Sequence, residues 1–486
     1  EGSSLTFSVA LNYAPVASPY TVTISAPQTS PAVPGYVATP TYVIDPANSG
    51  TGSTTLTFTT ANYATPQTVT INAPENYYID NKTTTLSFSG AGVTTKNYSI
   101  TVVDNDPVEH MLVDDGMGPA CNDVSTSYDG VKMLVAAQCS NGGTFNRVKA
   151  FRCESNFSYC LDTNSATLDN GGDNNARSLT ALYNAGQAMI ISENKTNGRM
   201  NFFTGPLGSW TYYDMSDVAK FNLGNTTSIS PRAAWDATNS KVIVAASYTS
   251  GLYLYSFDKF GNSLNTPVNI PAANMDPGIM IETVTDTTNG KVTATFQYQP
   301  VVGQYALAFV QCNLDLTGCS APATFSSLIG NMADGNPLWI KHSQGLYDAT
   351  TNKFYLITSM ANTEGGADTI PKLIICNPDI TGCSAQTIYT ANRSGIKTKI
   401  AVDNFNNKLL ILAYDSTQSY SVELNRCSLT GTGCTRKNLT GSFGMNIGSN
   451  IANPFIDTVN KKLRFVAINN ASGGVLSMFS MLLYID

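Results

Sequence analysis

The chain has 486 residues, of which only 13% are charged, and its net charge is −7. It contains no basic cluster that could neutralise a phosphate backbone, which excludes nucleic acid as a partner. No apolar run reaches the roughly 18 residues that a membrane-spanning helix needs. No charged and apolar leader is found at Glu1, so we expect either a processed product or a part of a longer chain.

Residues 1–106 contain no cysteine and are rich in Thr, Pro and Ala. Apolar and polar residues alternate, as in half-buried strands, in LTFSVALN, YTVTISA, TTLTFTT, QTVTINA, TTLSFSG and YSITVVD. About 100 residues of such strands predict an immunoglobulin-like β-sandwich.

The two ends of this region, EGSSLTFSVAL and NYSITVVDND, resemble those of a Calx-β domain, an adhesion-associated extracellular sandwich linked to calcium. The intervening QTVTINAPENYYIDNKTTTLSFSG is similar to the penultimate strands of that family. The resemblance implies a Ca²⁺ site formed by Glu1, Asp104 and Asp106, with Glu75 as a further contributor, because carboxylate oxygens suit this hard cation.

Two departures from the family pattern bear on this prediction. Asn81 and Lys82 stand where the family carries acids, and a lysine opposes a dication, so the alternative is that no cofactor is bound. Family members also have a further strand before the EG. Donation of that strand by a neighbouring subunit is one explanation, and it would make the edge near Ser3–Val9 a site of self-assembly.

The ten cysteines form a regular pattern after residue 120. Eight of them lie in four C-x6-C units, and a hairpin turn at Tyr128-Asp129-Gly130 places the remaining two opposite each other. Zinc sites are disfavoured because the chain has only two histidines and no C-x2-C spacing. The alternative of free thiols in a cytosolic protein explains the spacing less well. We therefore predict a secreted or cell-surface protein with five local disulfides: Cys121–Cys139, Cys153–Cys160, Cys312–Cys319, Cys376–Cys383 and Cys427–Cys434.

A second repeat consists of a polar turn, usually with an Asp, followed by a residue that opens an apolar strand. The strand-opening residues follow one another at intervals of 50 to 62 residues, which predicts seven units: Lys132, Gln187, Lys241, Lys291, Lys353, Lys408 and Lys462. Units of this length made of short strands are typical of a β-propeller. A β-helix or open solenoid is the alternative, but its coils are shorter and hairpin disulfides require antiparallel neighbours.

Each unit is predicted to contain four strands, as in LYDA, FYLITSM, KLIIC and SAQTIYT around Lys353. The C-x6-C element then joins the third strand to the fourth. The last unit is one strand short, and residues 108–116 could supply its outer strand, which would close the ring and remove an open edge. The predicted fold is therefore all-β, with a sandwich over residues 1–106 and a disulfide-stapled seven-bladed propeller over residues 107–486.

Candidate functional residues are few. The Asp that precedes the strand-opening Lys in five units could form a carboxylate ring, but hydrogen bonding within the turns is the preferred interpretation. His110 and His342 offer little material for a Ser-His-Asp arrangement. Three tryptophans near strand ends are candidates for stacking on a sugar ring or anchoring a protein partner: Trp210, Trp235 and Trp339.

These features favour a recognition or adhesion protein, of the kind found on bacterial surfaces, that presents a propeller face to a protein or glycan. One alternative is a carbohydrate-active enzyme, a glycosidase or lyase with carboxylates at the propeller axis. A second alternative is a structural subunit that assembles through the sandwich edge. Unpaired acids at the axis would favour the enzyme, and small or apolar residues there would favour binding.

Overall fold

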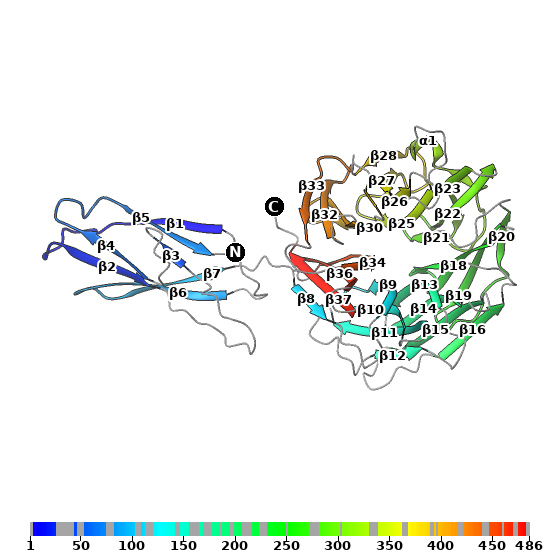
Figure 1. The fold of residues 1–486 in the computed structure, drawn as a ribbon, viewed down its shortest axis with the longest axis horizontal. Coiled ribbons are helices and arrows are strands. Elements are labelled where there is room, and N and C mark those ends of the chain that lie inside the picture. The colour runs from blue at the N-terminus through cyan, green and yellow to red at the C-terminus, as the bar shows by residue number, and fades with distance from the viewer. Residues whose placement is uncertain are drawn as a thin grey trace. The chain divides into compact units, whose positions relative to one another are not determined.

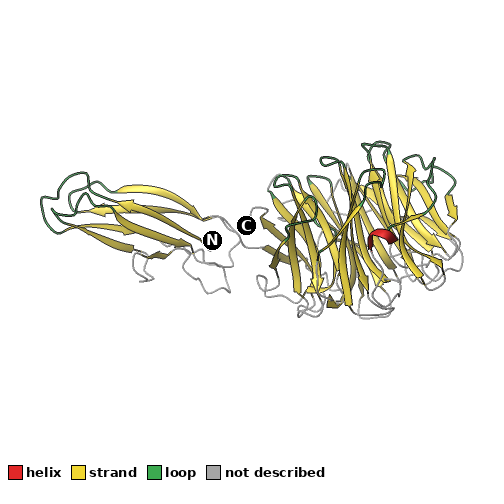
Figure 2. Ribbon diagram, turned by 90° about the horizontal axis from the view of Figure 1, so that it is seen from above, coloured by secondary structure: helices red, strands yellow, loops and turns green. Residues whose placement is uncertain are grey.

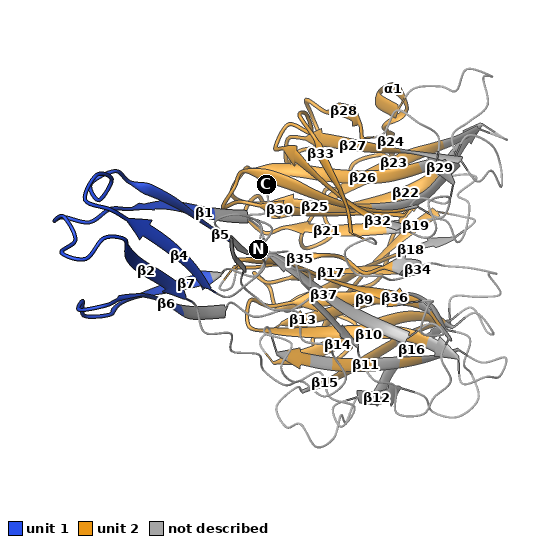
Figure 3. Ribbon diagram, turned by 60° about the vertical axis from the view of Figure 1, so that its left-hand side comes forward, with its two compact units in different colours: residues 1–107, 485 blue, residues 108–484, 486 orange. Residues whose placement is uncertain are grey.

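The computed structural model of this chain forms two compact units, residues 1–107 and residues 108–484 (Figure 3). The residues that the structure describes are 3–25, 43–45, 53–73, 82–102, 108–111, 120–140, 146–154, 165–168, 176–184, 186–194, 199–206, 216–222, 231–248, 251–271, 281–301, 304–329, 339–361, 368–388, 393–394, 397–415, 421–439, 447–458, 461–469 and 475–482. Within them, no helix is long and apolar enough to cross a membrane.

Unit 1 contains two antiparallel sheets that share one apolar cluster. Buried side chains of the cluster alternate with exposed ones, as in Leu56 and Phe58 of the second sheet and Val69 and Ile71 of the first. Strand β1 pairs only with β5 in the described part of the unit. The first sheet has the order β1 (Ser3–Val9), β5 (Gln67–Ala73) and β3 (Val43–Asp45); the second has the order β4 (Ser53–Phe58), β2 (Tyr20–Ser25), β6 (Lys82–Gly90) and β7 (Lys96–Val102).

Unit 2 consists of seven antiparallel sheets in its described residues, which we number blade 1 to blade 7 in chain order. Blade 1 contains β9 (Ala120–Tyr128), β10 (Lys132–Ser140), β11 (Asn146–Glu154) and β12 (Ser165–Leu168). Blade 2 contains β13 (Ala176–Asn184), β14 (Gln187–Asn194), β15 (Arg199–Pro206) and β16 (Ser216–Asn222). Blade 3 contains β17 (Arg232–Asp236), β18 (Lys241–Tyr248), β19 (Gly251–Asp258) and β20 (Val268–Pro271).

The remaining blades repeat this order. Blade 4 contains β21 (Ile281–Asp286), β22 (Lys291–Val301), β23 (Gln304–Asn313) and β24 (Ala323–Thr324), followed by the short helix α1 (Ser326–Ile329). Blade 5 contains β25 (Trp339–Asp348), β26 (Lys353–Ala361), β27 (Asp368–Cys376) and β28 (Ser384–Thr387), with β29 (Arg393–Ser394) beside β27. Blade 6 contains β30 (Lys397–Asp403), β31 (Lys408–Asp415), β32 (Ser421–Ser428) and β33 (Thr435–Asn438). Blade 7 contains β34 (Ile447–Ile451), β35 (Phe455–Asp457), β36 (Lys462–Asn469), β37 (Val475–Leu482) and β8 (Val108–Met111).

The blades close into a ring. The first strands of consecutive blades contact one another in the order β9, β13, β17, β21, β25, β30 and β34, and β34 contacts β9 again. In Figure 1 these strands lie toward the centre of the ring, and fourth strands such as β12, β20 and β33 lie at its rim. Unit 2 is therefore a β-propeller. All seven strand-opening residues identified in the sequence begin a second strand of a blade, from Lys132 of β10 to Lys462 of β36.

Blade 7 combines distant parts of the chain. Its outer strand is β8, which pairs antiparallel with β37 so that Val108 lies opposite Ser480 and Met111 opposite Ser477. The four residues of β8 fall within the segment 108–116, which the sequence pattern predicted for this position. Without β8, the hydrogen-bonding edge of β37 would be open at the rim of the blade.

The repeated turn aspartate acts as predicted from turn chemistry. Asp236 Oδ1 accepts the backbone N–H groups of Thr238 and Asn239 at 3.0 and 3.2 Å, and its Oδ2 accepts the Asn239 side-chain amide at 2.7 Å. Asp286 and Asp403 bind the corresponding asparagines of their own turns. These carboxylates are buried and satisfied locally. The described turns of unit 2 gather at one end of its strands (Figure 2).

Three of the predicted disulfides are confirmed, and each joins the third strand of a blade to the segment just before the fourth: Cys312–Cys319, Cys376–Cys383 and Cys427–Cys434. Cys121 and Cys153 are also disulfide-bonded. Cys139 is the register partner of Cys121 across the hairpin of β9 and β10. Cys160, the predicted partner of Cys153, lies outside the described residues.

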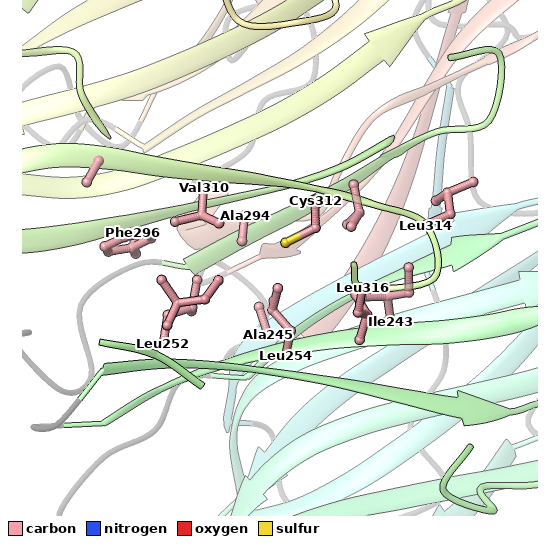
Figure 4. Packing of buried hydrophobic residues seen from close by; sticks show 13 residues of the cluster. Ile243, Ala245, Leu252, Leu254, Ala294, Phe296, Val310, Cys312, Leu314 and Leu316 are labelled. Carbon is pink, nitrogen blue, oxygen red and sulfur yellow. The ribbon is translucent and has the colours of Figure 1, made fainter. Parts of the chain in front are cut away.

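The stapled turn is also held by hydrogen bonds and packing. In blade 4, Asp315 accepts hydrogen bonds from the N–H and hydroxyl of Thr317, and the ammonium of Lys291 donates to Asn313 Oδ1 at 2.7 Å. Leu314 and Leu316 enter the cluster between blades 3 and 4, which Figure 4 shows from close by. Blade 3 keeps a turn at this place without cysteines, where Asp258 accepts hydrogen bonds from later residues of the turn.

We expect the staple to be a local stabiliser. The double variant Cys376→Ala/Cys383→Ala should lower the free energy of unfolding by about 2 to 3 kcal/mol, the chain-entropy value for so short a loop. Urea unfolding of the variant and the parent chain measures the difference. The fold should persist, because blade 3 forms the same turn without the bond; loss of the propeller's strand signal in circular dichroism would contradict this interpretation.

Hydrogen bonds cross every junction between neighbouring blades. Between blades 1 and 2, oxygens of Asp123, Ser125 and Ser127 accept backbone N–H groups of β13. At four other junctions a side chain donates to a backbone carbonyl of the neighbouring blade: Thr204 to Lys259, Thr283 to Arg232, Gln311 to Pro378, and Thr126 to Asn453. Gln344 both donates to the carbonyl of Ile400 and accepts its N–H group. Lys399 donates to the side-chain oxygen of Asn453. The ring is therefore held by polar contacts as well as by the apolar clusters between blades.

A substitution at Gln344 can measure how much these contacts contribute to stability. Its side chain is 4% exposed, donates to Ile400 O at 3.2 Å and accepts Ile400 N–H at 2.7 Å. Gln344→Leu leaves both backbone groups without this partner and should lower the free energy of unfolding by about 1 to 3 kcal/mol. The matched control Gln386→Leu, on the rim strand β28, should change it by less than about 0.5 kcal/mol in the same urea titration. Equal losses in the two variants would refute a special role for Gln344.

Candidate functional site

Charged side chains gather near the beginnings of the propeller's first strands. Five side chains from four blades influence one another there, and we call them the axial cluster: Asp123 of β9, Arg232 of β17, Glu282 of β21, and Lys397 and Lys399 of β30. Their strands surround the propeller axis (Figure 1). The cluster thus contains three cations and two carboxylates.

The hairpin register explains why these residues meet. Arg232, Glu282 and Lys399 each lie four residues before the turn aspartate of their blade, at Asp236, Asp286 and Asp403. They therefore stand at equivalent heights on three first strands. Two further residues share this position in blades 5 and 7: Gln344 and Asn453.

Glu282 is surrounded by opposite charge. Its side chain is partly buried, and this loss of solvent raises the pKa of the carboxyl above its ordinary value. The positive charges of Lys399 and Arg232 oppose this shift. Burial lowers the pKa of Lys399, and the repulsion of Arg232 adds to this; Glu282 and Asp123 act in the opposite direction. Lys399 Nζ also donates a hydrogen bond to Asn453 Oδ1 at 2.9 Å.

The remaining members are held in place by the backbone. Asp123 accepts the N–H groups of Val124 at 3.0 Å and Leu179 at 3.2 Å. Arg232 Nη1 donates to Pro231 O at 3.3 Å. Burial lowers the pKa of Lys397 to about 8, with Asp123 opposing and Lys399 reinforcing the shift.

This arrangement differs from both outcomes that the sequence suggested for the axis. The two acids are not an unpaired carboxylate dyad, because each lies in the field of cations. The axis is not lined only by small or apolar residues either. Ion pairs between partly exposed groups such as these contribute little to stability, so the cluster is a candidate functional site. Groups of this kind can bind a polar ligand or transfer a proton.

The metal ligands predicted from the sequence, Glu1, Asp104 and Asp106, lie outside the described residues, as does Glu75. No group of His, Cys, Asp or Glu side chains that could hold a metal ion occurs in the part of the chain that the structure describes. The calcium site stays a prediction.

Of the three tryptophans, the structure describes the side chain of Trp235 alone, and a ligand-binding role for Trp210 and Trp339 stays a prediction. The Trp235 indole packs against the apolar cluster between blades 2 and 3, and its Nε1 is buried without a hydrogen-bond partner among the described residues. Trp210 lies outside the described residues. The backbones of Trp339 and His342 belong to β25, and that of His110 to β8.

The chain is similar in fold to several solved structures. An ulvan lyase, described as a new family of polysaccharide lyase, has 12% sequence identity and a TM-score of 0.50, covering 76% of this chain and 95% of that one. The Dos1 propeller has 10% identity and a TM-score of 0.44, with coverages of 77% and 95%. AofleA from Arthrobotrys oligospora has 12% identity and a TM-score of 0.42, with coverages of 68% and 90%. The similarity to the ulvan lyase concerns the fold alone.

No protein-family model matches the chain, and no curated protein matches it either. The resemblance of residues 1–106 to the Calx-β domain therefore stays a prediction.

The lowered pKa of Lys397 predicts a pH dependence of stability. Between about pH 8 and its ordinary pKa of 10.5, Lys397 is protonated in the unfolded chain and loses its proton in the folded one. The unfolded state then binds more protons, so this residue makes the free energy of unfolding rise with pH. Lys397→Met should remove that contribution, as measured by urea unfolding at several pH values between 8 and 10. Lys437→Met, on the rim strand β33, is the control and should keep the parental slope; identical slopes in all three chains would contradict the prediction.

Proposed function

We propose that this chain is an extracellular recognition protein that binds a glycan at the axial cluster of its propeller. The observation that carries the proposal is the gathering of Arg232, Glu282, Lys397, Lys399 and Asp123 at one end of the first strands. Saccharide hydroxyls and charged substituents are recognised by such convergent polar groups. The disulfides support an oxidising compartment, where extracellular glycans occur.

The N-terminal unit fits this role as a Calx-β-like sandwich. Support comes from the shared apolar cluster of its two sheets and from the strand patterns at its two ends. Bound Ca²⁺ at Glu1, Asp104 and Asp106 is part of this proposal. The outer position of β1 in its sheet is the feature that would allow self-assembly through residues 3–9.

A carbohydrate-active enzyme is the second candidate, and one observation favours it. Glu282 has a raised pKa and Lys399 a lowered one, and the two influence each other. A carboxyl and an amine shifted toward neutrality in this way could act as acid and base on a saccharide. A polysaccharide lyase is among the solved structures of similar fold, which supports this candidate.

A glycan array combined with a search for cleavage products tests the proposal. We expect the whole chain to retain a defined group of glycans and to release no shortened or unsaturated products from them. Retention should be lost in the double variant Arg232→Gln/Lys399→Gln and kept in Lys372→Gln, whose lysine lies on β27 and donates to Thr387.

Product release that disappears in Glu282→Gln would establish the enzyme instead. Absence of any retained glycan from an array of broad composition, with the variants folded, would count against glycan recognition.

A further inference from the structure

We infer that the axial cluster binds an anionic group, so that the ligand is an acidic saccharide that carries a carboxylate or a sulfate. This inference rests on the proposed glycan recognition and adds the charge of the ligand to it. It is drawn from the signs of the five charges, their positions around the axis and the hydrogen-bonding capacity of Arg232.

The sign of the cluster is opposite to that of the chain. The whole chain has 27 basic and 34 acidic residues, whereas three cations face two carboxylates at the axis. An entering anion therefore meets a local excess of positive charge within an acidic protein.

The cations approach the axis from different sides of the ring. Arg232 belongs to blade 3, while Lys397 and Lys399 belong to blade 6, so two blades lie between them in one direction and three in the other. Arg232 and Lys399 repel each other, as do Lys397 and Lys399. A carboxylate or sulfate placed between these cations would be attracted by all three and would relieve their repulsion.

Arg232 has the donor geometry that oxyanions require. Its guanidinium carries five N–H donors in a planar fork, and the Pro231 carbonyl is the acceptor that the described residues provide for it. Such a fork can donate two parallel hydrogen bonds to one carboxylate or sulfate.

Glu282 acts as an internal competitor in this arrangement. Its carboxyl lies in the field of Arg232 and Lys399, the same two cations that would hold the ligand's anion. Removing its negative charge should strengthen the binding of an acidic ligand. A neutral ligand would not respond in this way, so the direction of the effect separates charge recognition from simple contact.

The experiment compares ligands that differ only in charge. Oligogalacturonate and its methyl ester are titrated calorimetrically into the whole chain, and carboxylated, sulfated and neutral members of the array are compared in parallel. We expect the acidic forms to bind at least about tenfold more tightly than their neutral counterparts. For the acidic forms, Arg232→Gln and Lys399→Gln should each weaken binding about tenfold, and Glu282→Gln should strengthen it about threefold.

The control is Lys372→Gln, which removes a positive charge outside the axial cluster and should change affinity by less than about twofold. If a cluster variant fails to fold, the salt dependence of the parent chain replaces it: acidic ligands should weaken at high salt and neutral ones should not. Equal binding of acidic and neutral forms would overturn the anion inference and leave glycan recognition intact. Retention of no glycan at all would instead overturn the proposed function and this inference with it.

Discussion

Closure of the ring is the constraint on which the rest of unit 2 depends. Each blade buries its faces only against two neighbours, so a missing contact at any junction would expose two apolar faces. The junctions combine apolar clusters with side-chain hydrogen bonds such as Gln344 to Ile400 and Thr283 to Arg232. Because the apolar contacts are not directional, the hydrogen bonds fix how far each first strand can slide along the next. The equivalent heights of the first strands follow from this.

The axial cluster depends on that alignment. Arg232, Glu282 and Lys399 influence one another because their strands stand level around the axis. A shift of one blade by a single residue would turn the side chain to the opposite face of its strand and break the cluster. The outer part of the blade is held by other contacts. The disulfides join third strands to the segments before the fourth, and the lysine bonds to Asn313 and Asn377 join second strands to the stapled turns. The contacts at the rim and the charges at the centre can therefore vary independently.

Much of the architecture could be predicted from the sequence because short, contiguous segments determine it. The strand-opening Lys241 and Lys291 follow their turn aspartates at a fixed distance, and the C-x6-C units enclose one turn each. The cluster was missed because its members are far apart in the chain and differ in residue type and in charge. A signal was present: position four before the turn aspartate carries Arg232, Glu282, Gln344, Lys399 and Asn453, all polar where a strand inside a propeller would usually be apolar. Which of these polar residues face one another depends on the number of blades, and sequence spacing does not show that.

The pairing of β8 with β37 has a consequence for how the protein is made. Val108 leaves the ribosome long before its partner Ser480. The first strand of the propeller to be synthesised, β8, can therefore pair only after the last one, β37, has been synthesised. Until residues 475–482 arrive, blades 1 to 6 form an open arc with unpaired strand edges and uncovered apolar faces at both ends. Joining such distant segments has a large entropic barrier and is slow. The local disulfides can form earlier, since each closes within a single turn, and they would keep the outer strands of blades 4 to 6 ordered during that interval.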